Sequence, residues 1–427
     1  MRADSRLLTG LALVSGAWGR VKYLGVAIPG IDFGCAIDGT CPVSTVTLPR
    51  TSLGGGDGEG QMKHFVEDDG MNIFRLRVAT SWQFMLNGHL GGKLDATNSD
   101  KYDKLVQACL GTGAYCMIDL HNFARWDGDI VGQGGSVKDD DLVDVWQQLA
   151  VKYAKNDKIV FGVMNEPHDL DIQLWAQTCQ KVVTAIRKAG AKSNIILLPG
   201  TNFASAETFV STGSAVALAN VTNPDGTTDN LLLDLHKYLD INNSGMHAEC
   251  TTDNVEVFRT IATWLRTNKR AAMISESGAS MDPTCMDRFC TQNNFISQNS
   301  DVFAGFIGWG AGSFDSSYVM SLTPSGSAGS YTDNKLMKQC IIGPFIKNAA
   351  PETTSSSSSP ASTSTGSSTT TRQILQETST PSDPIETSAN SSHSENGGSG
   401  CTPSVGPLAG GLIFAAVALF HSWQRFL

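Results

Sequence analysis

Two glutamates follow short apolar runs that have the pattern of β-strands. Glu166 lies in Asn165-Glu166-Pro167, just after the run 159–164, and Glu276 follows the run 271–275. Pro167 cannot donate to a strand ladder, so it should end the first strand and favour an extended backbone at Glu166. A carboxylic acid and a carboxylate on separate strands of one barrel form the arrangement that glycoside hydrolysis needs.

Other polar side chains also lie in or at the ends of apolar runs. They are Arg75, His121, Asn122, Asn165, His236, Tyr238 and Trp309. Each has a structural alternative, such as an ion pair for Arg75, a core or surface histidine, or a core position for Trp309. Their joint placement favours a site, because the carboxyl ends of barrel strands converge on one mouth.

The chemistry of these side chains suggests how they would act together in a site. We expect Arg75 to donate a hydrogen bond to Glu276 and, with the Tyr238 hydroxyl, to keep that carboxylate charged. The negative charge of Glu276 would favour the protonated form of Glu166, the acid. Asn165 could bond a sugar hydroxyl, and Trp309 could stack on a sugar ring.

Eight apolar runs are the elements that must position these side chains. They are residues 23–28, 72–78, 115–120, 159–164, 195–199, 231–235, 271–275 and 303–308. Apolar residues three or four apart mark helices between them, as in Leu142, Val145, Trp146, Leu149 and Tyr153, and in Leu174, Trp175, Cys179, Val182, Val183 and Ile186. Strands alternating with helices predict a (β/α)8 barrel. The alternative is an open doubly wound sheet, but Gly54-Gly55-Gly56 lacks the strand and helix that a phosphate-binding fingerprint requires.

Length and charge limit the possible partners. The chain has 427 residues, 41% of them hydrophobic, and a net charge of −10. One large domain with appendages fits this size. The acidic net charge, without a concentrated basic face, argues against nucleic acid as a partner. We expect a monomer with a neutral partner and no cofactor.

Both ends of the chain have the composition of processing segments. Arg2 and Arg6 precede an apolar run at 7–14, so residues 1–19 are predicted to be a secretory signal peptide. The barrel domain should span residues 20–348, and residues 349–400, rich in Ser and Thr, should form a disordered stalk. Residues 401–427 end in an apolar run that fits a glycosylphosphatidylinositol (GPI) attachment signal, with a membrane-spanning tail as the alternative. We therefore expect a secreted, extracellular protein that meets the membrane only through this anchor or tail.

Secretion would place the ten cysteines in an oxidising compartment, where disulfides form. Cys35 and Cys41, and Cys109 and Cys116, are close enough for local disulfides. The spacings do not match the ligand pairs of zinc sites, so no metal site is predicted. Sequons for N-glycosylation begin at three asparagines, which are Asn220, Asn242 and Asn390.

Four strings resemble the fungal endo-β-1,4-glucanases of glycoside hydrolase family 5. They are Ile118-Asp-Leu-His-Asn-Phe-Ala-Arg-Trp126, Met164-Asn-Glu-Pro-His168, His236-Lys-Tyr238 and Gly308-Trp-Gly-Ala-Gly-Ser-Phe314. The likeness covers most of residues 21–346 and implies a TIM barrel and a retaining mechanism. It implies that Glu166 is the acid/base and Glu276 the nucleophile, and that the supporting residues are Arg75, His121, Asn165, His236, Tyr238 and Trp309.

The resemblance also suggests four cystine pairs. These are Cys35 with Cys41, Cys109 with Cys116, Cys250 with Cys285, and Cys290 with Cys340. Cys179, on the apolar face of a predicted helix, would then be a buried free thiol.

The sequence therefore predicts an endo-β-1,4-glucanase acting on cellulose or mixed-linkage β-glucan. Hydrolysis of another β-glycan, such as β-1,3-glucan or mannan, remains an alternative, because loops choose among sugars. A non-catalytic glycan-binding protein of the cell wall is the other alternative. Binding alone would not require both Glu166 and Glu276.

Overall fold

The computed structural model describes residues 20–29, 35–41, 43, 56–76 and 81–347. The predicted signal peptide 1–19, the stalk 349–400, the tail 401–427 and the sequon at Asn390 lie outside the described residues. Within the described residues, Asn220 and Asn242 are exposed.

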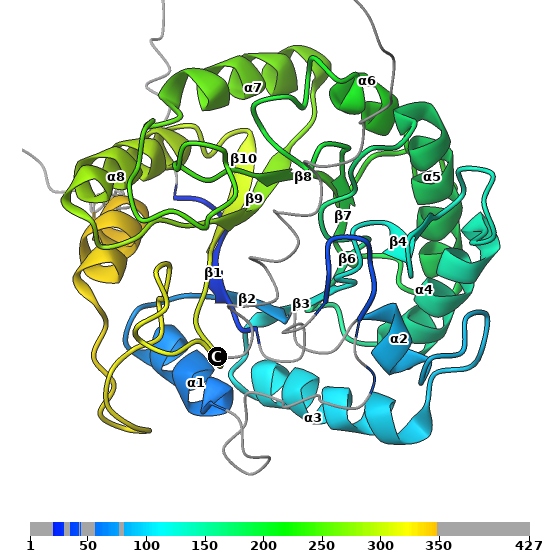
Figure 1. Ribbon diagram of the computed structural model, residues 1–427, viewed down its shortest axis with the longest axis horizontal. Coiled ribbons are helices and arrows are strands. Elements are labelled where there is room, and N and C mark those ends of the chain that lie inside the picture. The colour runs from blue at the N-terminus through cyan, green and yellow to red at the C-terminus, as the bar shows by residue number, and fades with distance from the viewer. Residues whose placement is uncertain (1–19, 30–34, 42, 44–55, 77–80, 348–427) are drawn as a thin grey trace, which may run out of the picture. The chain divides into compact units, whose positions relative to one another are not determined.

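Eight parallel strands close into a barrel, which confirms the predicted fold (Figure 1). They are β1 (Tyr23–Ala27), β2 (Ile73–Leu76), β3 (Tyr115–Asp119), β6 (Ile159–Gly162), β7 (Ile196–Pro199), β8 (Leu231–His236), β9 (Ala272–Ser277) and β10 (Phe303–Gly308). Each pairs with its neighbours in chain order, and β1 pairs with both β2 and β10. The sheet has no open edge, which rules out the doubly wound alternative.

Helices form a ring outside the barrel (Figure 1). They are α1 (Gly58–Glu67), α2 (Trp82–Met85), α3 (Ala96–Gly111), α4 (Asp139–Tyr153), α5 (Ile172–Lys188), α6 (Ser214–Ala219), α7 (Val255–Asn268), α8 (Pro283–Gln298) and the π-helix η2 (Met337–Lys347). A short antiparallel hairpin of β4 (Arg125–Trp126) and β5 (Asp129–Ile130) interrupts the connection from β3 to α4. None of the helices in these ranges is long and apolar enough to cross a membrane.

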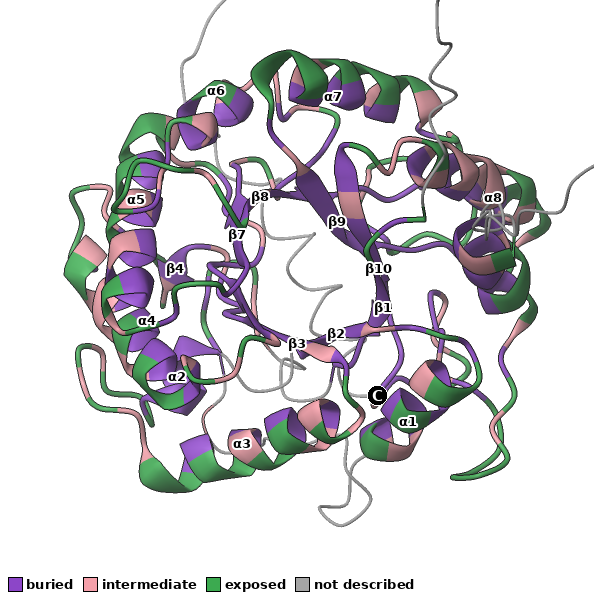
Figure 2. Cartoon of the chain, turned by 180° about the vertical axis from the view of Figure 1, so that it is seen from behind, coloured by how far each residue is buried: buried purple, intermediate pink, exposed green. Residues whose placement is uncertain are grey.

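Two hydrophobic cores lie on the two sides of the barrel wall. Alternate strand residues face opposite sides of a sheet. The inner core includes Ile73, Met117, Val160, Leu197 and Ile307. The outer core includes their neighbours Phe74, Ile118, Phe161, Leu198 and Phe306, together with helix residues. In Figure 2 the barrel strands are mostly buried, and the helices of the ring turn an exposed face outward, except α2, whose four residues are all buried. Arg75 follows Ile73 by two residues, so it shares the inward side.

Helix α5 illustrates how local sequence determines the ring. The carboxylate of Asp171 accepts hydrogen bonds from the backbone N–H groups of Gln173 and Leu174, and thereby caps the helix. Its buried stripe contains Trp175, Cys179, Val182, Val183 and Ile186, as the periodicity predicts. Leu174 was expected in this stripe but is 39% exposed, because the first turn places it beside the stripe.

The structure contains the four expected disulfides and a buried free thiol at Cys179. Burial raises the pKa of Cys179, so this thiol stays protonated and inert. The Cys290–Cys340 bridge spans 50 residues and Cys35–Cys41 spans 6. On the loop-entropy model the first stabilises the fold by about 4 kcal/mol and the second by about 2 kcal/mol.

Candidate active site

Glu166 lies beyond the end of its strand, in an unexpected backbone conformation. Strand β6 ends at Gly162, four residues earlier, and Glu166 has a φ of 47°. The expectation of an extended backbone before Pro167 is therefore wrong. A positive φ is costly for a residue with a Cβ, and such conformations cluster at functional sites. The turn directs the Glu166 side chain towards His236, on β8, with Nδ1 of the ring 2.8 Å from Oε1 of the carboxyl.

Glu276 lies inside β9 rather than after it. The register moves from Leu235 opposite Ile274 to His236 opposite Glu276, so β9 contains one extra residue relative to β8. Strict alternation along β9 would place the Glu276 side chain on the outer face of the barrel wall. The bulge turns it to the inner face. It brings Glu276 towards the barrel axis, where Arg75 lies.

Two donors hold the Glu276 carboxylate. Arg75 Nη1 donates to Oε2 at 2.6 Å, and the Tyr238 hydroxyl donates to Oε1 at 2.7 Å. Burial, together with the negative charge of Glu276, raises the pKa of Tyr238 well above its usual value, so the hydroxyl keeps its proton and remains a donor. The two oxygens are thus fixed from different sides.

Arg75 connects four segments of the barrel. Besides Glu276, its guanidinium donates through Nη2 to Asp119 Oδ2 at 2.9 Å and to Asn165 Oδ1 at 2.7 Å. The side chain is fully buried. Burial alone would lower the pKa of Arg75, but the charges of Asp119 and Glu276 outweigh it and raise this pKa. Arg75 is therefore a permanent cation that positions neighbours and does not reach solvent.

His236 lies between the two glutamates. Its Nδ1 bonds Glu166, and its Nε2 lies 3.1 Å from the Ser275 hydroxyl. Burial lowers the pKa of His236, whereas the charge of Glu276 and the bond to Glu166 raise it, with a net upward shift. The ring is 2% exposed, so its main contacts are with the protein.

The carboxyl groups of Glu166 and Glu276 face each other. One oxygen of each, together with a ring nitrogen of His236, lies in a group whose members are all within 4.8 Å of one another. Retaining glycosidases hold their two carboxyl groups about 5 to 5.5 Å apart, whereas inverting ones leave about 6.5 to 9.5 Å for a water. Glu166 is the more open of the two, with 19% of its side chain exposed against 6% for Glu276. This arrangement suits direct attack by one carboxylate.

The remaining predicted residues lie at different distances from this pair. Asn165 Nδ2 is 3.4 Å from His121 Nε2, so both join the Arg75 network. Trp309 donates through Nε1 to the Tyr318 hydroxyl and is only 6% exposed. Asn122 lies apart from the pair, because its side chain bonds the backbone of Trp82 and Gly39 and the side chain of Gln83.

Three contributors to the site were missed from the sequence. Asp119 ends β3 and accepts from Arg75, Ser275 bonds His236, and Tyr318 bonds Trp309. Asp119 could have been identified from the sequence, because it is a charged residue inside the apolar run 115–120 and a buried charge must be paired. Ser275 and Tyr318 could not, because a bulge and a loop bring them to the site.

The chain is similar in sequence to known cellulases. The family model for cellulases, glycosyl hydrolase family 5, matches residues 39–312. Endoglucanase EG-II of Hypocrea jecorina is 54% identical over 326 residues, covering 75% of this chain and 77% of that protein. Endoglucanase 1 of Saitozyma flava is 43% identical over 314 residues, covering 73% and 86% respectively.

Solved structures give the same picture. The crystal structure of Cel5A (EG2) from Hypocrea jecorina has a TM-score of 0.73 and 53% identity, and the match covers 75% of this chain and 98% of that one. XacCel5A in complex with cellopentaose has a TM-score of 0.65 and 29% identity, covering 76% and 99%.

Proposed function

The chain belongs to glycosyl hydrolase family 5 and is an endo-β-1,4-glucanase of the retaining type, in which we propose that Glu276 is the nucleophile and Glu166 the acid/base. The observation that carries these assignments is the approach of the two carboxyl groups to within 4.8 Å. Cellulose and mixed-linkage β-glucan are the substrates that we propose. The bound cellopentaose of XacCel5A supports a β-1,4-linked glucan.

In the first step of the proposed reaction, Glu276 attacks the anomeric carbon while Glu166 gives its proton to the glycosidic oxygen. The carbon–oxygen bond to the leaving sugar breaks, and a glycosyl ester forms on Glu276. Arg75 and Tyr238 support the assignment of Glu276, because both donate to its oxygens and orient it. The greater exposure of Glu166 supports its role, since the acid must reach the bridging oxygen and later a water.

In the second step, the ionised Glu166 removes a proton from water, which attacks the same carbon and releases Glu276. His236 bonds Glu166 throughout and fixes the direction in which the carboxyl points. Arg75 holds Asn165 Oδ1, so the amide N–H groups of Asn165 are left to donate, and we assign one of them to the sugar 2-hydroxyl. His121 holds the amide from its other side. Trp309, with little of its surface exposed, would present only part of its ring to a sugar.

Hydrolysis of a panel of polysaccharides tests the substrate. Carboxymethylcellulose and mixed-linkage β-glucan are expected to lose viscosity rapidly, with the β-anomer appearing first in NMR spectra, because double displacement retains configuration. Glu276→Gln protein is the matched control. Preferential cleavage of β-1,3-glucan or mannan would reassign the substrate. A protein that binds glucan without lowering its viscosity would be a wall-binding protein.

We also propose an extracellular location. The four disulfides fit an oxidising environment. On sequence composition we assign residues 1–19 to a signal peptide, 349–400 to a stalk and 401–427 to a GPI-attachment signal. Release from cells by a phosphatidylinositol-specific phospholipase is the measurement that checks the anchor, and a cell-bound fraction that resists the enzyme would contradict it.

A further inference from the structure

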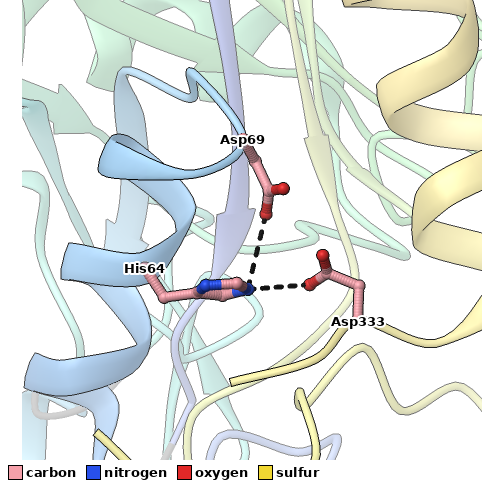
Figure 3. A group of neighbouring side chains, drawn as sticks. All are labelled: His64, Asp69 and Asp333. Atoms are coloured by element: carbon pink, nitrogen blue, oxygen red, sulfur yellow. Dashed lines mark hydrogen bonds and ion pairs between the residues drawn. The ribbon is translucent and has the colours of Figure 1, made fainter. Parts of the chain in front are cut away.

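A second cluster of ionisable side chains lies in the outer ring. His64 is on α1, Asp69 follows that helix, and Asp333 precedes η2 (Figure 3). His64 Nε2 is 3.1 Å from Asp333 Oδ1 and 3.7 Å from Asp69 Oδ2. Figure 3 shows both carboxyl groups facing the same ring nitrogen. The mechanism above uses none of these residues.

The cluster is buried, and one of its oxygens lacks a hydrogen bond. The side chains of His64, Asp69 and Asp333 are 7%, 8% and 6% exposed. Among the described residues, nothing donates a hydrogen bond to Asp69 Oδ2, although this atom points into the cluster. A buried carboxylate oxygen without a donor is costly unless something else supplies positive charge.

The hydrogen bond at Nδ1 of His64 determines which ring nitrogen could bind a metal ion. Nδ1 lies 2.6 Å from Asp68 Oδ2, and an ionised carboxylate only accepts, so Nδ1 carries a proton and donates it. Nε2 then faces two further carboxyl groups with either a proton or a lone pair. An outer carboxylate bonded to the far nitrogen of a histidine is the usual support of a metal-binding imidazole.

The single imidazole of His64 lies among three carboxyl groups, those of Asp68, Asp69 and Asp333. Those of Asp69 and Asp333 are buried and both face Nε2, whereas that of Asp68 is exposed. Two buried carboxyl groups facing one ring nitrogen suit a cation.

We propose that His64 Nε2, Asp69 Oδ2 and Asp333 Oδ1 bind one divalent transition-metal ion, with Zn²⁺ and Mn²⁺ as the best candidates. The three donor atoms all lie within 4.8 Å of one another. Bonds of about 2.0 to 2.2 Å require neighbouring donors roughly 3 to 3.5 Å apart, so only a small movement of Asp69 is needed. An imidazole with two carboxylates favours these ions over Ca²⁺ and Mg²⁺, which prefer oxygen ligands alone.

The ion would connect distant parts of the chain. His64 and Asp333 are 269 positions apart, and the bond joins α1 to the segment that enters η2. The role of the ion would be structural, because it would link α1 to the segment before η2 and so stabilise the contact between the first and last parts of the barrel domain. The spacing of histidines and cysteines in the sequence did not predict this site, since its ligands come from separate segments.

Metal content and thermal stability of the full chain test the proposal. Protein stripped with a chelator and dialysed is titrated with ZnCl₂ and then MnCl₂ by calorimetry, and bound metal is counted by mass spectrometry. We expect one equivalent, with Zn²⁺ binding more tightly than Mn²⁺. Tm should rise by about 5 °C when free metal is a hundredfold above Kd.

Substitutions separate this cluster from the active site, where Glu166, His236 and Glu276 also lie close enough to hold an ion. Asp69→Asn should weaken binding by at least about 100-fold, and Asp68→Asn, which removes only the outer support, by about 10- to 100-fold. Glu67→Gln, an exposed neighbour, is the matched control and should bind like wild type. The double variant Glu166→Gln/Glu276→Gln should also keep its equivalent of metal.

Two results would overturn the proposal. One is stripped wild-type protein that binds no Zn²⁺ or Mn²⁺. That result would mean that His64 Nε2 carries a proton and holds the carboxyl groups by hydrogen bonds, without a metal. The other is binding that survives Asp69→Asn but disappears in the Glu166→Gln/Glu276→Gln variant, which would place the ion in the active site. Should Asp69→Asn fail to fold, Asp333→Asn serves in its place, and the wild-type titration remains decisive.

Discussion

Glu276→Ala is expected to lower kcat on an aryl β-cellobioside by on the order of 10⁵-fold. Without this carboxylate, nothing on that side of the sugar can form the glycosyl ester. Added azide should restore turnover, because it fits the space that the side chain leaves, and it should yield the α-glycosyl azide. The measurement is release of the aryl alcohol with and without azide, with NMR assignment of the product.

Glu256→Ala provides the control for this experiment. Glu256 is exposed on α7, where its carboxylate pairs with Arg259, so activity should be unchanged and azide should have no effect. A Glu276→Ala enzyme that keeps a tenth of wild-type activity would remove Glu276 from the nucleophile role. So would a rescued product with the β configuration.

Glu166→Ala should produce a loss that depends on the leaving group. For cellooligosaccharides, whose leaving alcohol needs a proton, we expect kcat to fall by about 10³- to 10⁴-fold. For a dinitrophenyl cellobioside, the first step needs no acid, so a burst of dinitrophenolate should precede slow turnover. The second step lacks its base, and the glycosyl-enzyme should accumulate as a mass increase of one cellobiosyl group.

The two glutamates can be distinguished by this pair of experiments. In Glu166→Ala, azide attacks the glycosyl-enzyme and should give the β-glycosyl azide, opposite to the product from Glu276→Ala. Equal losses on good and poor leaving groups would contradict the role of Glu166. The same stereochemistry of azide product from both variants would contradict the division of labour between them.

The positions of the strands could be predicted because each is a short apolar run between helical patterns. The run 303–308 matches β10 at both ends, and residues 115–120 match β3 to within one residue. The run 159–164 was too long, because Val163 and Met164 are buried in the loop beyond β6 and therefore look like strand residues. Hydrophobicity reports burial, and it does not distinguish a strand from a buried loop.

The details of the site were less accessible. The bulge in β9 depends on pairing with β8 and β10, which no local pattern encodes. The left-handed backbone of Glu166 runs against the preference of a residue before proline, so tertiary contacts decide it. The residues of the site could be identified because a barrel brings the carboxyl ends of its strands together. The contacts among these residues could not, because they depend on the three-dimensional structure.

Arg75 has a consequence for how this protein can change over evolutionary time. One guanidinium divides its donors among Glu276, Asp119 and Asn165. A mutation of any one partner changes the hydrogen bonds that Arg75 makes to the other two. The effects of mutations at these partners will therefore not be additive. We therefore expect a substitution at one of these four positions to be tolerated only together with a compensating change at another.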